Sequence, residues 1–286
     1  MIDKKFLRTR EGLIRFTLRM LKKHGIRPQK SLGQHFLVDP ILIDVIIDSL
    51  ELSKEDIVAE IGSGLGTLTL FLAEKCKKVV AIEIDRRLVN ALHEVLKGYD
   101  NVEIMHADAL TISINADKIT SNVPYSISSR LLEHLLKRCK FKLAALTFQL
   151  EFARRLYASP GTRDYSRITI LANYYSIVEK VLTIPPSSFL PSPKVYSQLV
   201  KILPREVPPF KVKDDEFFFR IVRELFTLRN KTLRRALIIA GKNMKIPSEV
   251  LKEALRQLEP LLGLRVYMLR PIDFAQIANL LFDLTH

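Results

Sequence analysis

Runs of apolar, β-branched residues alternate with amphipathic stretches through the first half of the chain. Such runs predict strands at residues 57–61, 78–84 and 102–106, and strand-like segments follow at residues 118–122 and 143–149. Between them, apolar positions recur with helical spacing at residues 66–75, 86–97 and 127–137. This order predicts an α/β fold, with a mostly parallel sheet and helices on both faces.

The pattern changes after residue 149. A loop rich in Gly, Asp and Arg, a helix, a proline-rich segment and a last strand are predicted at residues 159–166, 167–175, 184–193 and 195–202. Pro204, Pro208 and Pro209 then interrupt any regular element and mark a linker, so we expect a domain boundary near residue 206.

Four further helices are predicted beyond this linker, at residues 215–228, 231–240, 247–258 and 272–284. The second domain is therefore expected to be small and helical. The whole chain would then consist of a basic N-terminal extension, an α/β domain and a helical domain, at residues 1–30, 31–206 and 207–286.

Composition narrows the class of protein. A chain of 286 residues suffices for about two domains, and its 48% hydrophobic and 27% charged residues fit a folded protein better than a disordered one. No apolar run approaches the roughly 18 residues of a membrane span, so we expect no membrane partner. Cys76 and Cys139 lie at no zinc or disulfide spacing, which favours a reduced, cytoplasmic setting and no metal. The Arg-rich first 25 residues could alternatively imitate an organellar presequence.

The net charge of +14 is unevenly distributed. Residues 1–30 hold ten Lys or Arg and two acids, and residues 204–286 hold fifteen and ten, whereas the segment between them is nearly neutral. A near-neutral centre with basic flanks predicts a polyanionic partner, and nucleic acid is the first candidate. Two alternatives stay open: the basic residues could be solubilising faces or could contact a membrane surface.

A glycine-rich turn follows the first predicted strand. Gly62, Gly64 and Gly66 stand where a strand runs into a helix, and ligands bind at such carboxyl ends in open α/β sheets. Glu83 ends the second strand, 21 residues after Gly62, where an acid reaches the ribose hydroxyls of a nucleoside. Asp108 follows the third strand and could accept a hydrogen bond from an adenine amino group.

These residues favour one nucleoside cofactor over another. NAD would require glycine where the chain has Thr67, and no other pyrophosphate-binding feature is evident. S-adenosylmethionine has no phosphate, and its ribose and adenine suit acids at successive strand ends. Each feature alone has an ordinary explanation, the glycines as a structural turn and Asp108 as a helix cap. Together they predict S-adenosylmethionine.

An Asn-Val-Pro-Tyr tetrapeptide, residues 122–125, follows the fourth strand. An exocyclic adenine amine is a poor nucleophile because its lone pair is delocalised into the ring, so an enzyme must offer acceptors that favour a pyramidal nitrogen. The Asn122 side-chain oxygen and the Val123 carbonyl can do this, and Pro124 would help to hold them in place. Tyr125 can stack on the base. Alone, the tetrapeptide could be a strand-to-helix turn.

A base must leave its stack before it enters such a pocket, and a second aromatic face would hold it there. Phe189, in the proline-rich segment, is the candidate for this face. The alternative is a core phenylalanine beside a proline turn.

With these motifs, the chain resembles the small-subunit rRNA adenine N6,N6-dimethyltransferases, in a form closest to the archaeal and eukaryotic members. Two positions depart from the family pattern: Val123 replaces the usual Leu but keeps the backbone carbonyl, and Leu150 replaces a common Lys. The resemblance covers nearly the whole length and rests on residues 30–37, 60–69, 82–85, 106–110, 122–125, 148–151, 164–167, 189–197 and 229–234.

The resemblance implies a Rossmann-like S-adenosylmethionine-dependent methyltransferase that acts as a monomer on a pre-ribosomal particle. It would transfer four methyl groups to two adjacent adenosines in the 3′-terminal hairpin of small-subunit rRNA. It places cofactor contacts on His35, Leu37, Gly62, Glu83, Asp108 and Asn122, to which we add Glu60, Gly64 and Ala109 from the same motifs. By residue type alone, His35 would be a capping or core histidine. RNA contacts are expected at Phe189, Arg229, Lys231, Arg234 and Arg235.

Two other functions stay open. A large-subunit rRNA adenine methyltransferase of the kind that confers macrolide resistance shares these motifs, although the basic N-terminal extension and the Lys-Thr-Leu helix favour the small subunit. A nonenzymatic assembly or transcription factor could use the same fold, although the intact Gly62, Glu83, Asp108 and Asn122 favour cofactor binding.

Overall fold

The computed structural model describes residues 4–29 and 32–285, so Lys30 and Ser31 of the expected N-terminal motif lie outside the described residues. The chain divides into two compact units. The first comprises Met1–Ala153 and Ile177–Pro204, and the second Arg154–Ser176 and Arg205–His286. The three-part division expected from the sequence stays a prediction, and it differs from this one mainly in the placement of Arg154–Ser176.

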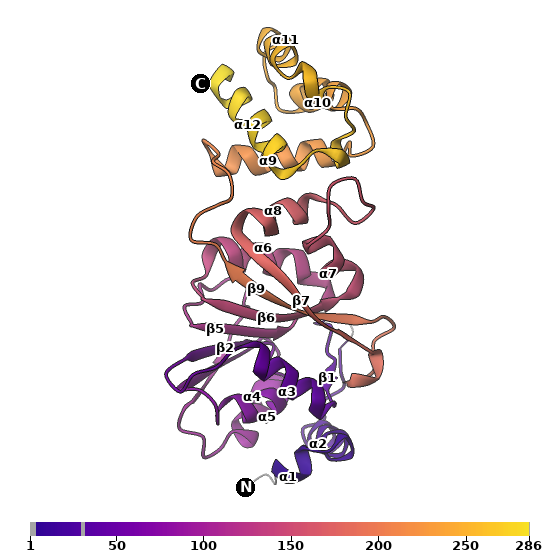
Figure 1. Cartoon of the computed structure of the whole chain (residues 1–286). Helices are drawn as coiled ribbons and strands as arrows, with labels where there is room; N and C mark the ends of the chain where they lie inside the picture. The colour runs from indigo at the N-terminus through magenta and orange to yellow at the C-terminus, as the bar shows by residue number, and fades with distance from the viewer. Residues whose placement is uncertain (1–3, 30–31, 286) are drawn as a thin grey trace. The chain divides into compact units, whose positions relative to one another are not determined.

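Seven strands of the described residues form one mixed sheet, in the order β4-β3-β2-β5-β6-β9-β7 (Figure 1). β4, β3, β2, β5 and β6 run parallel, whereas β9 is antiparallel to β6. The five strands predicted in the first half are confirmed, and the edge strand β7 was not predicted. The strands are Ile57–Ile61 (β2), Lys78–Glu83 (β3), Val102–His106 (β4), Lys118–Asn122 (β5), Leu143–Gln149 (β6), Ser176–Ile184 (β7) and Ser197–Pro204 (β9).

Helices cover both faces of this sheet, as predicted (Figure 1). β3 and β6 lie on opposite sides of the β2–β5 pair, so right-handed crossovers put the helices that lead to them on opposite faces. Because these five strands run parallel, their carboxyl ends meet at one edge of the sheet. The helices of this unit beyond the N-terminal pair are Pro40–Ser49 (α3), Thr67–Leu72 (α4), Arg86–Val95 (α5), the short turn Tyr125–Ile127 (η2), Ser128–Arg138 (α6) and Leu150–Leu156 (α7), whose last residues fall in the second unit.

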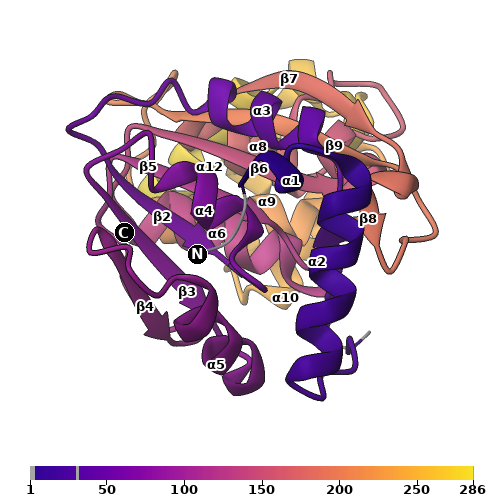
Figure 2. The same ribbon diagram turned by 90° about the horizontal axis from the view of Figure 1, so that it is seen from below.

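The basic N-terminal segment is a helical part of the first unit. The short helix α1 (Lys4–Leu7) precedes α2 (Arg10–Lys23), which lies near β8 (Phe189–Leu190) in Figure 2. The Arg10 side chain donates a 2.8 Å hydrogen bond to the Ser187 carbonyl, just before β8. The ammonium group of Lys23 pairs with the Glu94 carboxylate at 2.6 Å. One face of α2 thus belongs to the core and the other presents basic side chains to solvent. The apolar side chains that join the core are Leu13, Phe16, Met20 and Leu21.

A two-stranded sheet joins two segments that are distant in the sequence. β1 (Phe36–Leu37) pairs antiparallel with β8 (Phe189–Leu190), and Leu37 lies opposite Phe189. β8 directly follows the turn Pro186–Ser188 (η3). The segment before α3 and the proline-rich segment therefore pack together.

The second unit is helical, as predicted, and is built around an aromatic core. Phe218, Leu237 and Phe274 are buried in it, and the buried Tyr165 hydroxyl donates a 2.7 Å hydrogen bond to the Leu269 carbonyl. The four C-terminal helices are confirmed, with ends that differ by up to three residues from those predicted. The elements are Arg167–Tyr175 (α8), Asp215–Phe226 (α9), Leu233–Asn243 (α10), Ser248–Gln257 (α11), Glu259–Leu261 (η4), Val266–Met268 (η5) and Pro271–Thr285 (α12).

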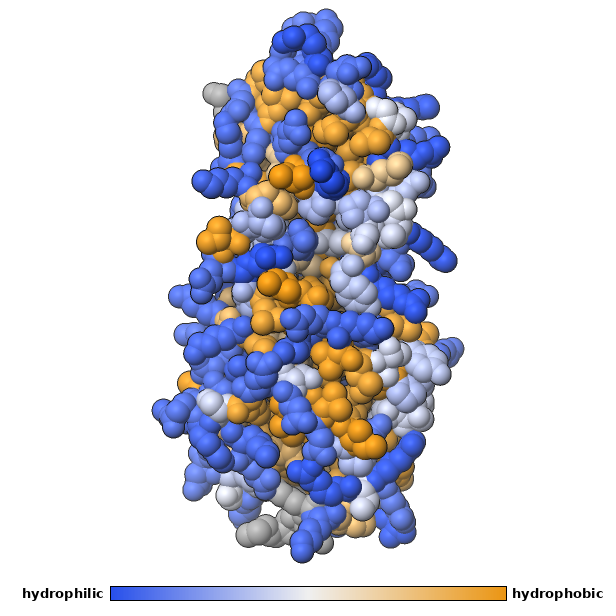
Figure 3. All heavy atoms as spheres, in the orientation of Figure 1, coloured by the Kyte–Doolittle hydropathy of each residue, from blue (hydrophilic) through white to orange (hydrophobic). Residues whose placement is uncertain are grey.

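The face of the molecule drawn in Figure 3 is largely polar. Figure 3 shows hydrophilic side chains over much of the visible face, with apolar side chains in separate groups between them. In the part of the chain that the structure describes, no helix has both the length and the apolar character needed to cross a membrane.

Candidate active site

A cavity of about 390 Å³ lies at the carboxyl ends of β2, β3 and β5, within the first unit. Its size suits a small molecule or a cofactor. Pro124 and Phe189 also line it, whereas its described lining residues do not include Val123 or Tyr125. All the residues expected to contact a cofactor line this one cavity: His35, Leu37, Glu60, Gly62, Gly64, Glu83, Asp108, Ala109 and Asn122.

The glycine turn has a backbone that favours glycine. Gly62, Gly64 and Gly66 have φ angles of 74°, 58° and 76°, in the left-handed region. The Gly62 N–H donates a 2.8 Å hydrogen bond to the Ile82 carbonyl, which fixes the turn to β3. Apart from Gly62 itself and its two neighbours in the chain, no described residue has a heavy atom within 4 Å of the place where a Cβ of residue 62 would stand. A ligand can therefore approach the backbone closely at Gly62.

Glu83 is the acid at the end of β3 and is only 5% exposed. One carboxylate oxygen accepts from the Gly64 N–H at 2.9 Å, and the other accepts from the Ile84 and Asp85 N–H groups, each at 2.9 Å. Burial raises the pKa of Glu83, while these backbone bonds lower it by a smaller amount. The bonds fix the carboxylate in the cavity wall, with acceptor capacity left for hydroxyl groups of a ligand.

Glu60 lies at the end of β2 and also lines the cavity. The residue is 4% exposed, and its carboxyl group accepts a hydrogen bond from the Thr69 hydroxyl. Burial, with a smaller contribution from the nearby Glu83, raises the pKa of Glu60 to about 8. At neutral pH this side chain is therefore mostly a neutral acid.

Asp108 combines the two roles considered for it. One carboxylate oxygen accepts from the Leu110 N–H at 2.9 Å, which is the turn-capping role. The side chain is half-buried and lines the cavity beside the buried Ala109. No described protein donor bonds the other carboxylate oxygen, so it can accept from a ligand.

The tetrapeptide loop is held from three sides. The Asn122 Nδ2 donates a 3.0 Å hydrogen bond to the His35 carbonyl, and the Val123 N–H donates one of 3.0 Å to the Thr147 carbonyl. The Tyr125 hydroxyl lies 2.9 Å from the Ser197 Oγ, and burial raises the pKa of this phenol. These contacts restrain both the backbone and the polar side chains of the loop.

His35 lies between the tetrapeptide loop and the proline-rich segment. Its ring stacks on the Tyr125 ring, with centroids 5.9 Å apart, and its Nδ1 lies 2.6 Å from the Pro191 carbonyl. A histidine in this place connects two loops and also faces the cavity. From residue type alone, His35 was expected to have only a structural role, as a capping or core histidine.

Phe189 takes part in both the core and the cavity wall. It is 4% exposed, belongs to the apolar core of the first unit and lines the cavity. Phe189 is thus a core phenylalanine, and its place in the cavity wall is also compatible with contact to a bound base.

The basic residues expected to contact RNA lie in the second unit. Lys231, Arg234 and Arg235 are exposed at the start of α10 and on the turn before it. Arg229 is half-buried, and its guanidinium donates hydrogen bonds of 3.0 and 3.3 Å to the carbonyls of Arg163 and Thr162. Arg229 therefore braces the loop before α8. Among the described residues, no group of three or more His, Cys, Asp or Glu side chains could hold a metal ion.

Several residues of the site were not found from the sequence. Gln34 belongs to the N-terminal motif at residues 30–37, yet only the fold reveals that it bonds to Asp85, which is 51 positions away. No periodic pattern or spacing signals such a pair. Further lining residues not anticipated are Ser121, Arg130 and Thr147.

Comparisons with known proteins identify the family of this chain. Residues 25–259 match the family model described as ribosomal RNA adenine dimethylase. A relative from Methanosarcina mazei, described as a probable ribosomal RNA small subunit methyltransferase A, is 42% identical over 267 residues, which cover 93% of this chain and 97% of the relative. A ribosomal RNA small subunit methyltransferase A from Halothermothrix orenii is 37% identical over 254 residues, covering 85% and 84%.

Two solved structures are similar to this chain over most of its length. A dimethyladenosine transferase from Plasmodium falciparum is 34% identical, with a TM-score of 0.75 over 85% of this chain and 96% of that one. The 23S rRNA methyltransferase ErmE is 29% identical, with a TM-score of 0.64 over 86% and 99%. The predicted Rossmann-like methyltransferase fold is confirmed. With the family model matching most of its length, the chain belongs to the ribosomal RNA adenine dimethylase family and is an enzyme of that class.

Proposed function

We propose that the chain uses S-adenosylmethionine to dimethylate the N6 amines of two adjacent adenosines in the 3′-terminal hairpin of small-subunit rRNA, on a pre-ribosomal particle. The observation that carries this proposal is the meeting, in one cavity, of two acids suited to a nucleoside and of the Asn122 acceptor. The names of the archaeal and bacterial relatives favour the small subunit. A monomer in the cytoplasm is the simplest form that fits this function.

The cavity fits the cofactor by its donor set. Its acids, Glu83 and Asp108, suit ribose hydroxyls and an adenine amino group, and the open backbone at Gly62 permits close approach. When bound, S-adenosylmethionine supplies a methyl group on a positively charged sulfonium. Glu83 binds the ribose hydroxyls, Asp108 accepts from the adenine amine, and His35 with Leu37 completes the wall.

The target adenine is held by the tetrapeptide loop. The Asn122 Oδ1 and the Val123 carbonyl accept from the N6 amine and favour a pyramidal nitrogen, whose lone pair is then available for the methyl group. Preorganised acceptors of this kind do not have to reorient during the reaction. Tyr125 and Phe189 stack on the flipped base, and such stacking contributes about 1–3 kcal/mol per base.

Basic side chains on each unit bind the RNA backbone. Lys231, Arg234 and Arg235 are exposed on the second unit, and Arg19 and Lys22 are exposed on α2 of the first unit. Such contacts position the RNA by its phosphates and leave the choice of base to the cavity.

The test is methyl transfer to isolated ribosomal particles. The purified chain is incubated with S-adenosylmethionine, labelled in its methyl group, and with small-subunit or large-subunit particles that lack the modification. We expect label in the small-subunit rRNA alone. Label confined to large-subunit rRNA would favour the activity named for ErmE. No label in either, from a chain that binds the cofactor, would favour a nonenzymatic assembly factor.

A further inference from the structure

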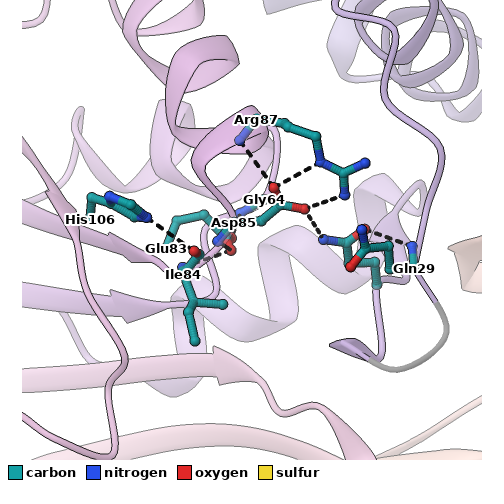
Figure 4. A network of polar contacts seen from close by, with 8 residues as sticks. Gln29, Gly64, Glu83, Ile84, Asp85, Arg87 and His106 are labelled. Carbon is teal, nitrogen blue, oxygen red and sulfur yellow. Dashed lines mark hydrogen bonds and ion pairs between the residues drawn. The ribbon is translucent and has the colours of Figure 1, made fainter.

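Asp85 carries a charged network at the edge of the cavity (Figure 4). Its carboxylate accepts from the Arg87 backbone N–H at 3.0 Å and from the Nε and Nη2 of the Arg87 side chain at 3.0 and 2.6 Å. The side chain of Asp85 is buried, and the fork from Arg87 is the main reason that its pKa falls to about 2. Asp85 is therefore a fixed negative charge at the start of α5.

Gln34 is a further donor to this charge. Its Nε2 donates a 2.8 Å hydrogen bond to Asp85 Oδ2, and its Oε1 accepts one of 2.8 Å from the Gln29 N–H. An N–H group can only donate and a carboxylate can only accept, so the two partners fix the orientation of the amide. The bond to Asp85 is charge-assisted and hence stronger than one between neutral groups.

The same network continues to the acid that faces the cavity. The Asp85 N–H donates to Glu83, and the second oxygen of Glu83 accepts from the Gly64 N–H, each at 2.9 Å. Gln34 and its neighbours from residue 32 to residue 37 line the cavity. One line of hydrogen bonds thus joins this segment, the end of β3 and the glycine turn.

We propose that Gln34 is a positioning residue for the cofactor, which holds segment 32–37 against the end of β3 through its hydrogen bond to Asp85. The proposal rests on the proposed use of S-adenosylmethionine. Gln34 acts through the residues that it places, because its amide is engaged by Gln29 and Asp85. Its loss should therefore weaken cofactor binding and leave turnover at saturating cofactor nearly unchanged.

The first test compares two Gln-to-Ala variants of the full chain. The dissociation constant of S-adenosylhomocysteine is measured by calorimetry, and KM for S-adenosylmethionine is separated from kcat. We expect Gln34→Ala to raise both constants about tenfold, with kcat within about twofold of the unmodified chain. Gln257→Ala is the matched control, since Gln257 donates a 2.6 Å bond to the Glu253 carboxylate on α11. It should change neither constant.

The second test exchanges the polarity of the bond. Gln34→Glu keeps the acceptor for Gln29 but sets a second carboxylate against Asp85, so its loss of affinity should exceed that of Gln34→Ala. Adding Asp85→Asn restores an amide donor toward residue 34 and keeps a capping oxygen for α5. The Arg87 Nη2 loses its acceptor at the exchanged atom, so affinity should recover in part, above that of Gln34→Glu alone.

Distinct results contradict the distinct claims. Unchanged S-adenosylhomocysteine binding by Gln34→Ala, or a double variant no better than Gln34→Glu alone, would overturn the role of Gln34. An unmodified chain that binds neither S-adenosylhomocysteine nor S-adenosylmethionine would instead overturn the proposed cofactor.

Discussion

The side-chain amide of Asn122 donates a hydrogen bond to the backbone carbonyl of His35, 87 positions earlier in the chain. A carbonyl oxygen can only accept, so the Nδ2 of Asn122 is committed to this bond and its Oδ1 remains as an acceptor. The N-terminal segment thereby sets which atom of Asn122 is offered to a substrate amine before any substrate binds.

Removal of this acceptor should abolish methyl transfer. We expect Asn122→Ala to reduce kcat at least about 100-fold, the usual consequence of losing one preorganised polar group at the reacting atom. RNA binding should survive, because the phosphate contacts lie elsewhere. Methyl transfer and gel-shift assays on the same preparation check both, and methylation at the normal rate would refute the role of Asn122.

Three exposed cations should account for part of the salt dependence of RNA binding. The combined change of Lys231, Arg234 and Arg235 to Gln should weaken binding and flatten the plot of log affinity against log salt by about two to three units, since each phosphate contact contributes nearly one. Fluorescence titrations at several salt concentrations measure this slope.

A control pair lies on α11, where Lys252 and Arg256 are paired with Glu249 and Glu253 at 2.9 and 2.6 Å. Changing these two cations to Gln should alter the slope less. Equal slopes in all three proteins would remove the start of α10 from the RNA-binding surface.

Substitution of Arg229 should affect stability, unlike substitution of the exposed cations at the start of α10. Its guanidinium holds the carbonyls of Thr162 and Arg163, so Arg229→Gln should lower the free energy of unfolding by about 1–2 kcal/mol. Thermal unfolding measures this loss. A variant with unchanged stability and a flattened salt slope would instead make Arg229 a phosphate contact.

Stability should depend on the protonation of Glu60. Its pKa is raised from 4.5 to about 8, so the folded state binds more protons than the unfolded state between these pH values. The stabilisation is fully present below pH 4.5 and is lost as the pH rises to about 8, with a total effect on the order of 5 kcal/mol. The raised pKa of Glu83 acts in the same direction.

Glu60→Gln removes this titration without changing the size of the side chain. The variant should therefore gain stability relative to the unmodified chain as the pH rises from 5 to 8, whereas the exposed Glu55→Gln should not. Denaturant unfolding at several pH values measures the free energy of unfolding of each variant. Parallel pH profiles for both chains would contradict a neutral Glu60.

Two variants separate the core role of Phe189 from its proposed stacking role. Phe189→Ala leaves a cavity in the core and should cost about 3–5 kcal/mol of stability. Phe189→Leu keeps most of the apolar volume and should cost less than about 1.5 kcal/mol. If Phe189 stacks on the flipped base, the Leu variant should still lose about tenfold in kcat/KM for RNA. Full activity in this folded variant would leave Phe189 as a core residue only.

The fold was largely predictable because its central strands are buried on both faces. Ile57–Ile61 and Leu143–Gln149 are mainly apolar runs of strand length, whereas Ile119 is the one apolar residue of Lys118–Asn122. The predicted bounds of all three agree with the structure. The edge strand Ser176–Ile184 was not predicted although most of its residues are apolar, because Glu179 and Lys180 interrupt the apolar run. The two-residue strand Phe36–Leu37 is too short to carry any periodic signal.

The site was predictable only where its residues stand at fixed places along a strand. Glu83 and Asp108 were found because Glu83 ends one strand and Asp108 closely follows another at the binding edge. The role of His35 came from family resemblance alone. Gln34 was missed because its partner, Asp85, is a helix cap that nothing in the sequence marks as a contact of the N-terminal segment.

The central claim is best tested by locating the methyl groups. Small-subunit rRNA from unmethylated particles is incubated with the chain and S-adenosylmethionine, digested to short fragments and sequenced by mass spectrometry. We predict N6,N6-dimethyladenosine at two adjacent positions near the 3′ end and nowhere else. Unmodified adenosines at those positions, with the chain folded and the cofactor bound, would contradict the account.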